Sequence, residues 1–112
     1  TLFFYTTLFR FMTLAELLDD PDGRDRLERI ARRYGVAKIR VFGSVARGEA
    51  TAASDIDLLV SFHEGRHPGW LVFDLQRDLE ELLGRRVDLS TEAMWREGRR
   101  RQVLREAEAI YG

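Results

Sequence analysis

The fold of this chain is decided by two short segments, Gly43-Ser44-Val45-Ala46-Arg47-Gly48 and Ser54-Asp55-Ile56-Asp57-Leu58-Leu59-Val60. The second segment places two aspartates at the head of a dense apolar run, which predicts a strand over residues 55–62. Residues i and i+2 of a strand face the same way, about 6.6 Å apart. The carboxylates of Asp55 and Asp57 are therefore expected to project together from one face of that strand.

Two aspartates in a strand need a chemical reason, because aspartate is depleted in strands. Carboxylates this close raise each other's pKa and repel unless a cation lies between them. Oxygen-only ligands suit magnesium, and two such ions about 3.5–4 Å apart form a phosphoryl-transfer site. Alone, an Asp-x-Asp triplet is more often the solvated face of an edge strand, so its interpretation depends on the rest of the sequence.

The first segment follows a β-branched run, Lys38–Phe42, that is predicted to be a strand. Gly43 would let the backbone approach a phosphate closely, and a short helix from Ser44 would direct its first N–H groups at an anion. Ser44 is expected to cap that helix or to donate its hydroxyl to a phosphate oxygen. Glu49 and Ala50 stand where a Walker A loop needs Lys and Ser or Thr, which excludes a P-loop NTPase.

A third aspartate, Asp88, lies in the short run Arg86–Leu89, which is also predicted to be a strand. Its apolar neighbours alternate away from it, so its carboxylate lies on the face opposite theirs. If this strand lies beside residues 55–62, Asp88 converges on the other two aspartates. It could then take a proton from an attacking hydroxyl or hold that hydroxyl beside a second metal ion. In isolation it would be interpreted as a surface residue.

The apolar spacing elsewhere predicts helices before, between and after the strands. Two helical faces repeat at i+3 and i+4 and end at glycines; their residues are Leu27, Ile30, Ala31, Tyr34 and Gly35, then Leu71, Leu75, Leu79, Leu82 and Gly84. Asp19 to Gly23 is expected to be a turn, and Ser90 is expected to cap a last helix that runs to about Ile110. The prediction is an α+β fold, with a three-stranded sheet and the order α-β-α-β-α-β-α.

Composition limits the classes of function that are open to the chain. Its 112 residues predict one small domain, 45% hydrophobic and 33% charged, with a formal net charge of -1. That charge argues against strong nucleic-acid binding through a broad basic surface. Lys38 is the sole lysine, and the chain has no cysteine for a disulfide or a thiolate zinc site. No apolar run is long enough to cross a membrane, and a cytoplasmic location is expected.

The combined pattern resembles the DNA polymerase β-like nucleotidyltransferases. Gly43-Ser44, Asp55-x-Asp57 at the head of an apolar strand, and one aspartate on the next strand are especially similar to the minimal nucleotidyltransferases, the MNT family. The resemblance covers residues 24–111. It implies the nucleotidyltransferase fold, with a mixed sheet, in a single domain over residues 12–112.

The resemblance also implies roles for individual residues. Asp55, Asp57 and Asp88 would form the catalytic triad and bind Mg²⁺, with two ions expected. Gly43 and Ser44 would hold the β- and γ-phosphates of the substrate ATP. Two weaker candidates for nucleotide binding are Arg47 and Ser54. The reaction would be in-line attack of a hydroxyl on the α-phosphorus, with pyrophosphate leaving.

Members this small resemble the antitoxin half of HEPN–MNT toxin–antitoxin pairs. The resemblance implies transfer of AMP from ATP to a hydroxyl of the HEPN RNase toxin, with tyrosine as the expected acceptor, in a hetero-oligomer with that toxin. Two alternatives stay open. The chain could neutralise the toxin by binding and masking it without catalysis, or it could be a small-molecule or RNA nucleotidyltransferase. The last is disfavoured because no acceptor-binding domain accompanies the motif.

Three further features bear on partners. Residues 1–11 are expected to be a non-native or upstream extension before a natural start at Met12, the alternatives being an extra strand or a partner-binding segment.

An arginine cluster near the end of the chain is expected to be a solvated helix face. The alternatives are that it binds the NTP triphosphate or an acidic patch on a partner; it comprises Arg96, Arg99, Arg100, Arg101 and Arg105. His63 and His67 are expected to be loop residues near the mouth of the site, and Trp70, Phe73 and Trp95 are expected to pack in the core or between helices.

Overall fold

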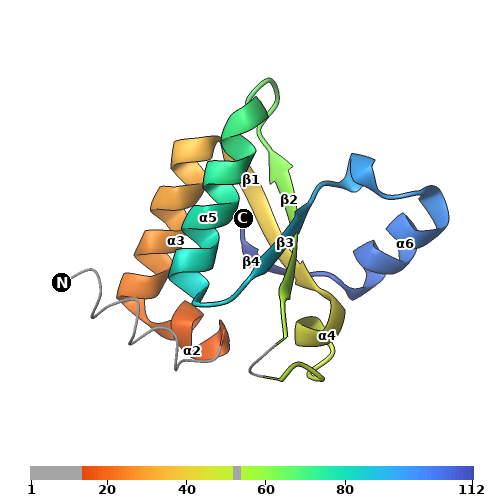
Figure 1. Ribbon diagram of the computed structural model, residues 1–112, viewed down its shortest axis with the longest axis horizontal. Coiled ribbons are helices and arrows are strands. Elements are labelled where there is room, and N and C mark those ends of the chain that lie inside the picture. The colour runs from red at the N-terminus through yellow and green to blue at the C-terminus, as the bar shows by residue number, and fades with distance from the viewer. Residues whose placement is uncertain (1–13, 52–53) are drawn as a thin grey trace.

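A four-stranded sheet carries helices on both faces in the computed structural model of the chain, which describes residues 14–51 and 54–112 (Figure 1). The elements follow in the order α2 (Leu14–Asp19), α3 (Pro21–Tyr34), β1 (Val36–Phe42), α4 (Gly43–Ala46), β2 (Ile56–Phe62), η1 (Gly69–Leu71), α5 (Val72–Leu83), β3 (Val87–Ser90), η2 (Glu92–Met94), α6 (Glu97–Glu106) and β4 (Glu108–Tyr111). The expected start at Met12, the expected extension over residues 1–11 and part of the small-residue loop at residues 50–54 lie outside the described residues.

The strands lie in the order β3-β2-β1-β4, and the sheet is mixed as expected. β1 pairs antiparallel with both β2 and β4, whereas β2 and β3 are parallel. The expected number of strands, three, is wrong. The predicted last helix ends at Glu106, and residues 108–111 instead pair with the free edge of β1. This edge offers unpaired backbone groups to any extended segment that reaches it, an interaction with no local sequence signal.

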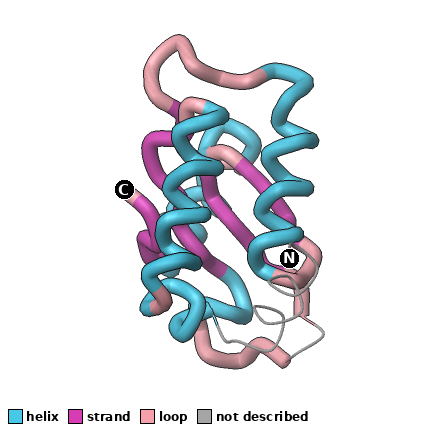
Figure 2. The backbone as a smooth tube through the Cα atoms, turned by 90° about the vertical axis from the view of Figure 1, so that its left-hand side faces the viewer, coloured by secondary structure: helices cyan, strands magenta, loops and turns pink. Residues whose placement is uncertain are grey.

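One face of the sheet packs on α3 and α5, which lie side by side across the strands (Figure 2). Alternate residues of the strands, such as Ile39 and Leu58, are fully buried beneath these helices. The predicted stripe on α3, together with Leu75, Leu79 and Leu82 of α5, supplies the other side of this core. Leu71, predicted as part of the same leucine stripe, precedes α5 and is 54% exposed, so that part of the prediction is wrong. The Tyr34 hydroxyl donates to the Asp78 carboxylate at 2.6 Å and joins the two helices.

The predicted turn at Asp19–Gly23 is wrong, because most of it forms the first turn of α3. Asp20 is the N-cap residue, its carboxylate accepts the Gly23 N–H at 2.9 Å, and Pro21 occupies the start of the helix. Gly23 is buried against α2, where a Cβ atom would lie 2.4 Å from the backbone oxygen of Leu17. The glycine therefore serves close packing of two helices rather than a turn.

The other face of the sheet is covered only in part, by α6 and the residues before it. Phe42, Leu59 and Val103 form a second, small buried cluster there. Trp95 packs on it as expected: its ring meets Phe42 edge-on at 5.8 Å, and its indole N–H donates to the Ser90 hydroxyl at 3.0 Å. Ser90 thus lies within β3 and is not the predicted helix cap.

Trp70 and Phe73 do not lie in the core, contrary to expectation. Their side chains are 87% and 61% exposed, and their rings stack on each other with centroids 6.2 Å apart. Trp70 lies in η1, before α5 begins, and for Phe73 the reason is the phase of α5. Leu75 and Leu79 take the side of the helix that faces the sheet, and a residue two positions before Leu75 projects away from it.

We predict opposite effects for alanine at two helical glycines. Gly23→Ala should lower the free energy of unfolding by about 1–3 kcal/mol, because its methyl group would overlap Leu17. Gly98→Ala should raise it by about 0.5–1 kcal/mol, because a Cβ on this α6 residue meets nothing within 4 Å. Urea unfolding of both variants checks this; equal effects would show that helix propensity, and not contact with α2, governs residue 23.

Candidate active site

Strand register brings the three aspartates of the predicted triad to one place. β2 and β3 pair in parallel so that Asp57 stands directly beside Asp88. Asp55 immediately precedes β2 and is exposed, rather than lying within the strand as expected. Asp57 shares a face of β2 with Leu59, so the carboxylates lie on the sparsely covered face of the sheet, next to α6.

Gly43 makes room for the central carboxylate. β1 pairs Phe42 with Asp57, so Gly43 follows at the point where the chain leaves the sheet and enters α4. Its φ is +73°, and a Cβ atom at this position would lie 2.2 Å from Oδ2 of Asp57. Only glycine fits such an approach at this backbone conformation. Contact of Gly43 with a phosphate stays a prediction, whereas its contact with Asp57 was not anticipated from the sequence.

The electrostatics of the site centre on Asp57. Burial raises the pKa of Asp57 above its usual value, and the charges of Asp88 and Asp55 raise it further. Arg47 acts in the opposite direction on the same pKa. Among the described residues, no three acidic or histidine side chains are close enough together to form a metal site. The charges of Asp55 and Asp88 nevertheless act unfavourably on that of Asp57.

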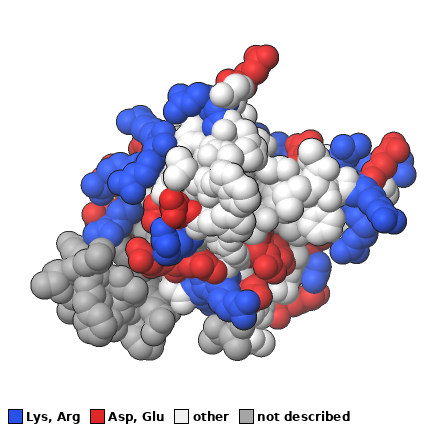
Figure 3. Space-filling view, turned by 45° about the horizontal axis from the view of Figure 1, so that its top comes forward, with Lys and Arg blue, Asp and Glu red and all other residues white. Residues whose placement is uncertain are grey.

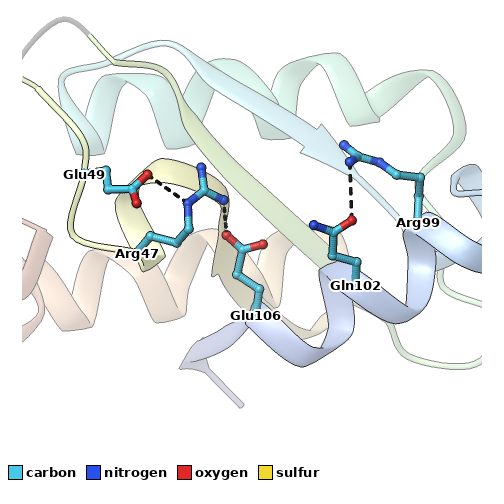
Figure 4. A network of polar contacts seen from close by, with 5 residues as sticks. All are labelled: Arg47, Glu49, Arg99, Gln102 and Glu106. Atoms are coloured by element: carbon cyan, nitrogen blue, oxygen red, sulfur yellow. Dashed lines mark hydrogen bonds and ion pairs between the residues drawn. The ribbon is translucent and has the colours of Figure 1, made fainter.

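Arg47 is held by carboxylates in a network that Figure 4 shows. Its Nε lies 3.0 Å from Oε2 of Glu49, and its terminal nitrogen pairs with Oε1 of Glu106 at the end of α6. Arg47 therefore bridges α4 and α6 across the edge of the site. A role in nucleotide binding stays a prediction and would require Arg47 to exchange these partners for phosphate oxygens.

The remaining predicted nucleotide-binding residues, Ser44 and Ser54, are held by their local backbone. Ser44 lies inside α4, which begins at Gly43 and takes Phe42 as its N-cap, so the expected capping by Ser44 is wrong. The Ser54 hydroxyl accepts the Thr51 N–H at 2.9 Å, directly before Asp55. Ser54 thus shapes the entry to β2.

Two residues of α5 that sequence reasoning missed hold the strand of Asp88. The side-chain amide of Gln76 donates to the Val87 carbonyl at 2.8 Å, and Oε2 of Glu80 accepts the Val87 N–H at 3.0 Å. Both backbone groups of the residue before Asp88 are therefore fixed by one helix turn. The i, i+4 spacing of Gln76 and Glu80 places them on one helix face, but nothing local shows that β3 lies under it.

The histidines lie away from this constellation. His67 stacks on Phe62, with ring centroids 4.9 Å apart, and its Nδ1 accepts the Gly69 N–H at 3.0 Å. Both histidines follow β2 at the end opposite Asp57, as loop residues. The expectation that they are loop residues is confirmed, whereas their expected closeness to the site is not.

Comparison with known proteins agrees with this geometry. The family model of the nucleotidyltransferase domain matches residues 24–110. This chain belongs to the nucleotidyltransferase domain family. A protein adenylyltransferase, MntA, of Thermococcus cleftensis is 47% identical to this nucleotidyltransferase over 78 residues, which are 69% of this chain and 77% of that protein. Three relatives from Methanocaldococcus jannaschii are 47–48% identical, and the chain spans 60–66% of their lengths.

Solved structures confirm the predicted fold of the nucleotidyltransferase. A structure described as a minimal nucleotidyltransferase is 49% identical and superposes with a TM-score of 0.63, covering 76% of this chain and 89% of that one. A crystal structure of a toxin–antitoxin with AMP-PNP is 21% identical and superposes with a TM-score of 0.58, over 79% of this chain and 72% of that one. The predicted family and enzyme class are thus confirmed. No helix of the described residues is long and apolar enough to cross a membrane.

We predict that Gly43→Ala disables the nucleotidyltransferase through its contact with Asp57. Gly48→Ala is the matched control, because Gly48 has the same φ of +73° but open space around its Cβ position. Both variants should lose about 1–2 kcal/mol of stability from the strained backbone. Only Gly43→Ala should lose nucleotide transfer, by about 100-fold or more, since a misplaced catalytic group costs that much. Equal activities of the two variants would contradict the assigned role of Gly43.

We predict that Asp57→Asn stabilises the metal-free protein at neutral pH. A carboxyl whose pKa is higher in the folded state contributes stability below its unfolded pKa, and that stability is lost as pH rises through the folded pKa. At pH 7 the charged Asp57 therefore costs stability, and its replacement should raise Tm by about 2–4 °C. Near pH 3 the difference should vanish. Calorimetry in EDTA measures both values; a lower Tm for Asp57→Asn at pH 7 would contradict the prediction.

Proposed function

We propose that this chain is a Mg²⁺-dependent adenylyltransferase that moves AMP from ATP to a hydroxyl of a protein partner. The observation that carries the proposal is the register of β2 and β3, which sets Asp57 beside Asp88 with Asp55 one residue before the strand. A structural domain has no use for three adjacent carboxylates, because their repulsion costs stability. A phosphoryl-transfer enzyme needs them to gather cations around a triphosphate.

The residues present fit magnesium. Asp55, Asp57 and Asp88 offer only oxygen ligands, and two of them are exposed enough to leave bound ions partly hydrated, as Mg²⁺ prefers. The raised pKa of Asp57 is the strain that a bound cation would relieve. When bound, the metal supplies positive charge to the phosphates and to the leaving pyrophosphate.

The side chains of the protein would contribute by positioning ATP and the acceptor hydroxyl. Gly43 and Ser44, at the end of β1, are proposed to hold the β- and γ-phosphates, with Arg47 and Ser54 in support. The acceptor hydroxyl oxygen would bond to the α-phosphorus while the bond from that phosphorus to the β-phosphate bridging oxygen breaks. Asp88 is proposed to accept the hydroxyl proton, and its exposure on the strand next to Asp57 supports this role.

The proposed acceptor is a tyrosine hydroxyl of a HEPN-type RNase toxin, with this chain as the antitoxin. Support comes from the protein adenylyltransferase relative and from the fold shared with one component of a toxin–antitoxin structure. The catalytic face is open except at α6, which leaves room for a protein surface. A purely masking antitoxin would keep full effect without the aspartates, so the two functions are separable.

The test is intact-mass measurement of the HEPN-type partner after incubation with the chain, Mg²⁺ and each NTP. We expect an added AMP from ATP only, loss of the product with Asp55→Asn or EDTA, and normal product with Asp25→Asn. Asp25 is the control because it is an exposed carboxylate on α3 that pairs with Arg29. Tight binding with no mass change would instead favour the masking antitoxin.

A further inference from the structure

Most arginines of α3 are neutralised by ion pairs, whereas those of α6 and its N-cap are not. On α3, Arg26, Arg29 and Arg32 each pair with an acidic residue four positions earlier, at 3.3, 2.9 and 2.6 Å. In the described part of the chain, no ion pair neutralises any of the α6 cluster, Arg96, Arg99, Arg100, Arg101 and Arg105. This cluster is therefore an uncompensated positive surface, not a self-neutralised helix face.

The helix presents this charge outward and beside the site. Val103 is the buried residue of α6, and Arg101 and Arg105 lie one turn apart on roughly the opposite side of the helix, both exposed. The helix ends at Glu106, which Arg47 ties to the edge of the catalytic face. In Figure 3 basic side chains gather at the right-hand end of the molecule, where α6 lies, with an acidic group among them, and a second basic group lies at the opposite end.

We propose that the α6 arginine surface, centred on Arg101 and Arg105, docks an acidic surface of the protein that accepts the nucleotide. Charge complementarity carries the choice of partner, because unpaired exposed guanidiniums pair bidentately with carboxylates. The position of α6 beside the site indicates that the bound protein is the acceptor of the nucleotide. A protein held there would bring its own surface over Asp57 and Asp88, on the one face of the sheet that is not fully covered.

A protein surface fits these surroundings better than a nucleic acid. The neighbouring exposed groups are the carboxylates of Asp55 and Asp88, which would repel a phosphate backbone that extends past α6. The net charge of the whole chain is -1, so no broad basic field supports the cluster. Met94, just before α6, is 68% exposed and adds the apolar contact that protein interfaces use.

This inference rests on the proposed function for the identity of the partner, so the experiment separates the two. Binding of the HEPN-type protein is measured by calorimetry without nucleotide, and AMP transfer is measured on the same samples with ATP. The variant is Arg101→Gln with Arg105→Gln. The control is Arg29→Gln with Arg32→Gln, which removes the same charge from exposed arginines on the opposite layer.

We expect the α6 variant to weaken partner binding by about 5-fold or more at low salt, and the control to leave it unchanged. Raising the ionic strength from about 0.05 M to about 0.3 M should weaken wild-type binding more than that of the variant. Affinity for Mg²⁺–ATP should be equal in all three proteins.

Three results would overturn the docking surface. They are unchanged partner affinity in the α6 variant, an equal loss in the control, and a loss of Mg²⁺–ATP affinity that reassigns the arginines to the triphosphate. Tighter binding of a single-stranded RNA oligonucleotide, lost in the α6 variant, would make nucleic acid the occupant. Absence of AMP transfer, with salt-dependent binding through α6 retained, would remove the proposed reaction and leave the docking surface standing.

Discussion

The close approach of the Asp57 carboxylate to the backbone at Gly43 is the constraint on which the rest of this molecule depends. It exists because β1 and β2 pair with Phe42 opposite Asp57, and because residue 43 then turns away with a positive φ. A side chain at residue 43 would push the carboxylate out of register with Asp88. The predicted site thus lies where β1 ends and β2 begins, and the absence of a Cβ atom at Gly43 allows this arrangement.

The same crowding gives the site its electrostatic character. Burial and two neighbouring carboxylates raise the pKa of Asp57, while Arg47 counteracts them from the end of α4. Arg47 also forms ion pairs with Glu49 and Glu106. These ion pairs connect the edge of the predicted site to α6. Repulsion among these carboxylates costs stability, and under the proposed function a bound cation would offset it. The charge of Asp57 therefore lowers the stability of the fold, and cation binding in the proposed reaction would remove this loss.

The two faces of the sheet have different roles: one stabilises the fold, and the other holds the predicted site. The face under α3 and α5 holds the main core and is closed to solvent. The other face holds the carboxylates, the small cluster around Leu59, and α6 with its uncompensated arginines. On this second face the ion pair of Arg47 with Glu106 joins the edge of the predicted site to the helix that carries these arginines, and opposite charges on one face orient a charged partner as well as attracting it.

The sequence by itself determined what depends on local spacing. The period-two pattern around Asp55 and Asp57, the helical stripes and the terminal glycines predicted the elements, and the combined motif predicted the family. Only the tertiary structure decided which segments meet. The pairing of residues 108–111 with β1, the packing of Gly23 on Leu17, the exposure of Trp70 and the hold of Gln76 on Val87 all join residues with no shared local pattern. The physical reason is that a strand edge, a helix contact or an ion pair takes its energy from a partner distant in the chain, so the sequence around one member carries no sign of the other.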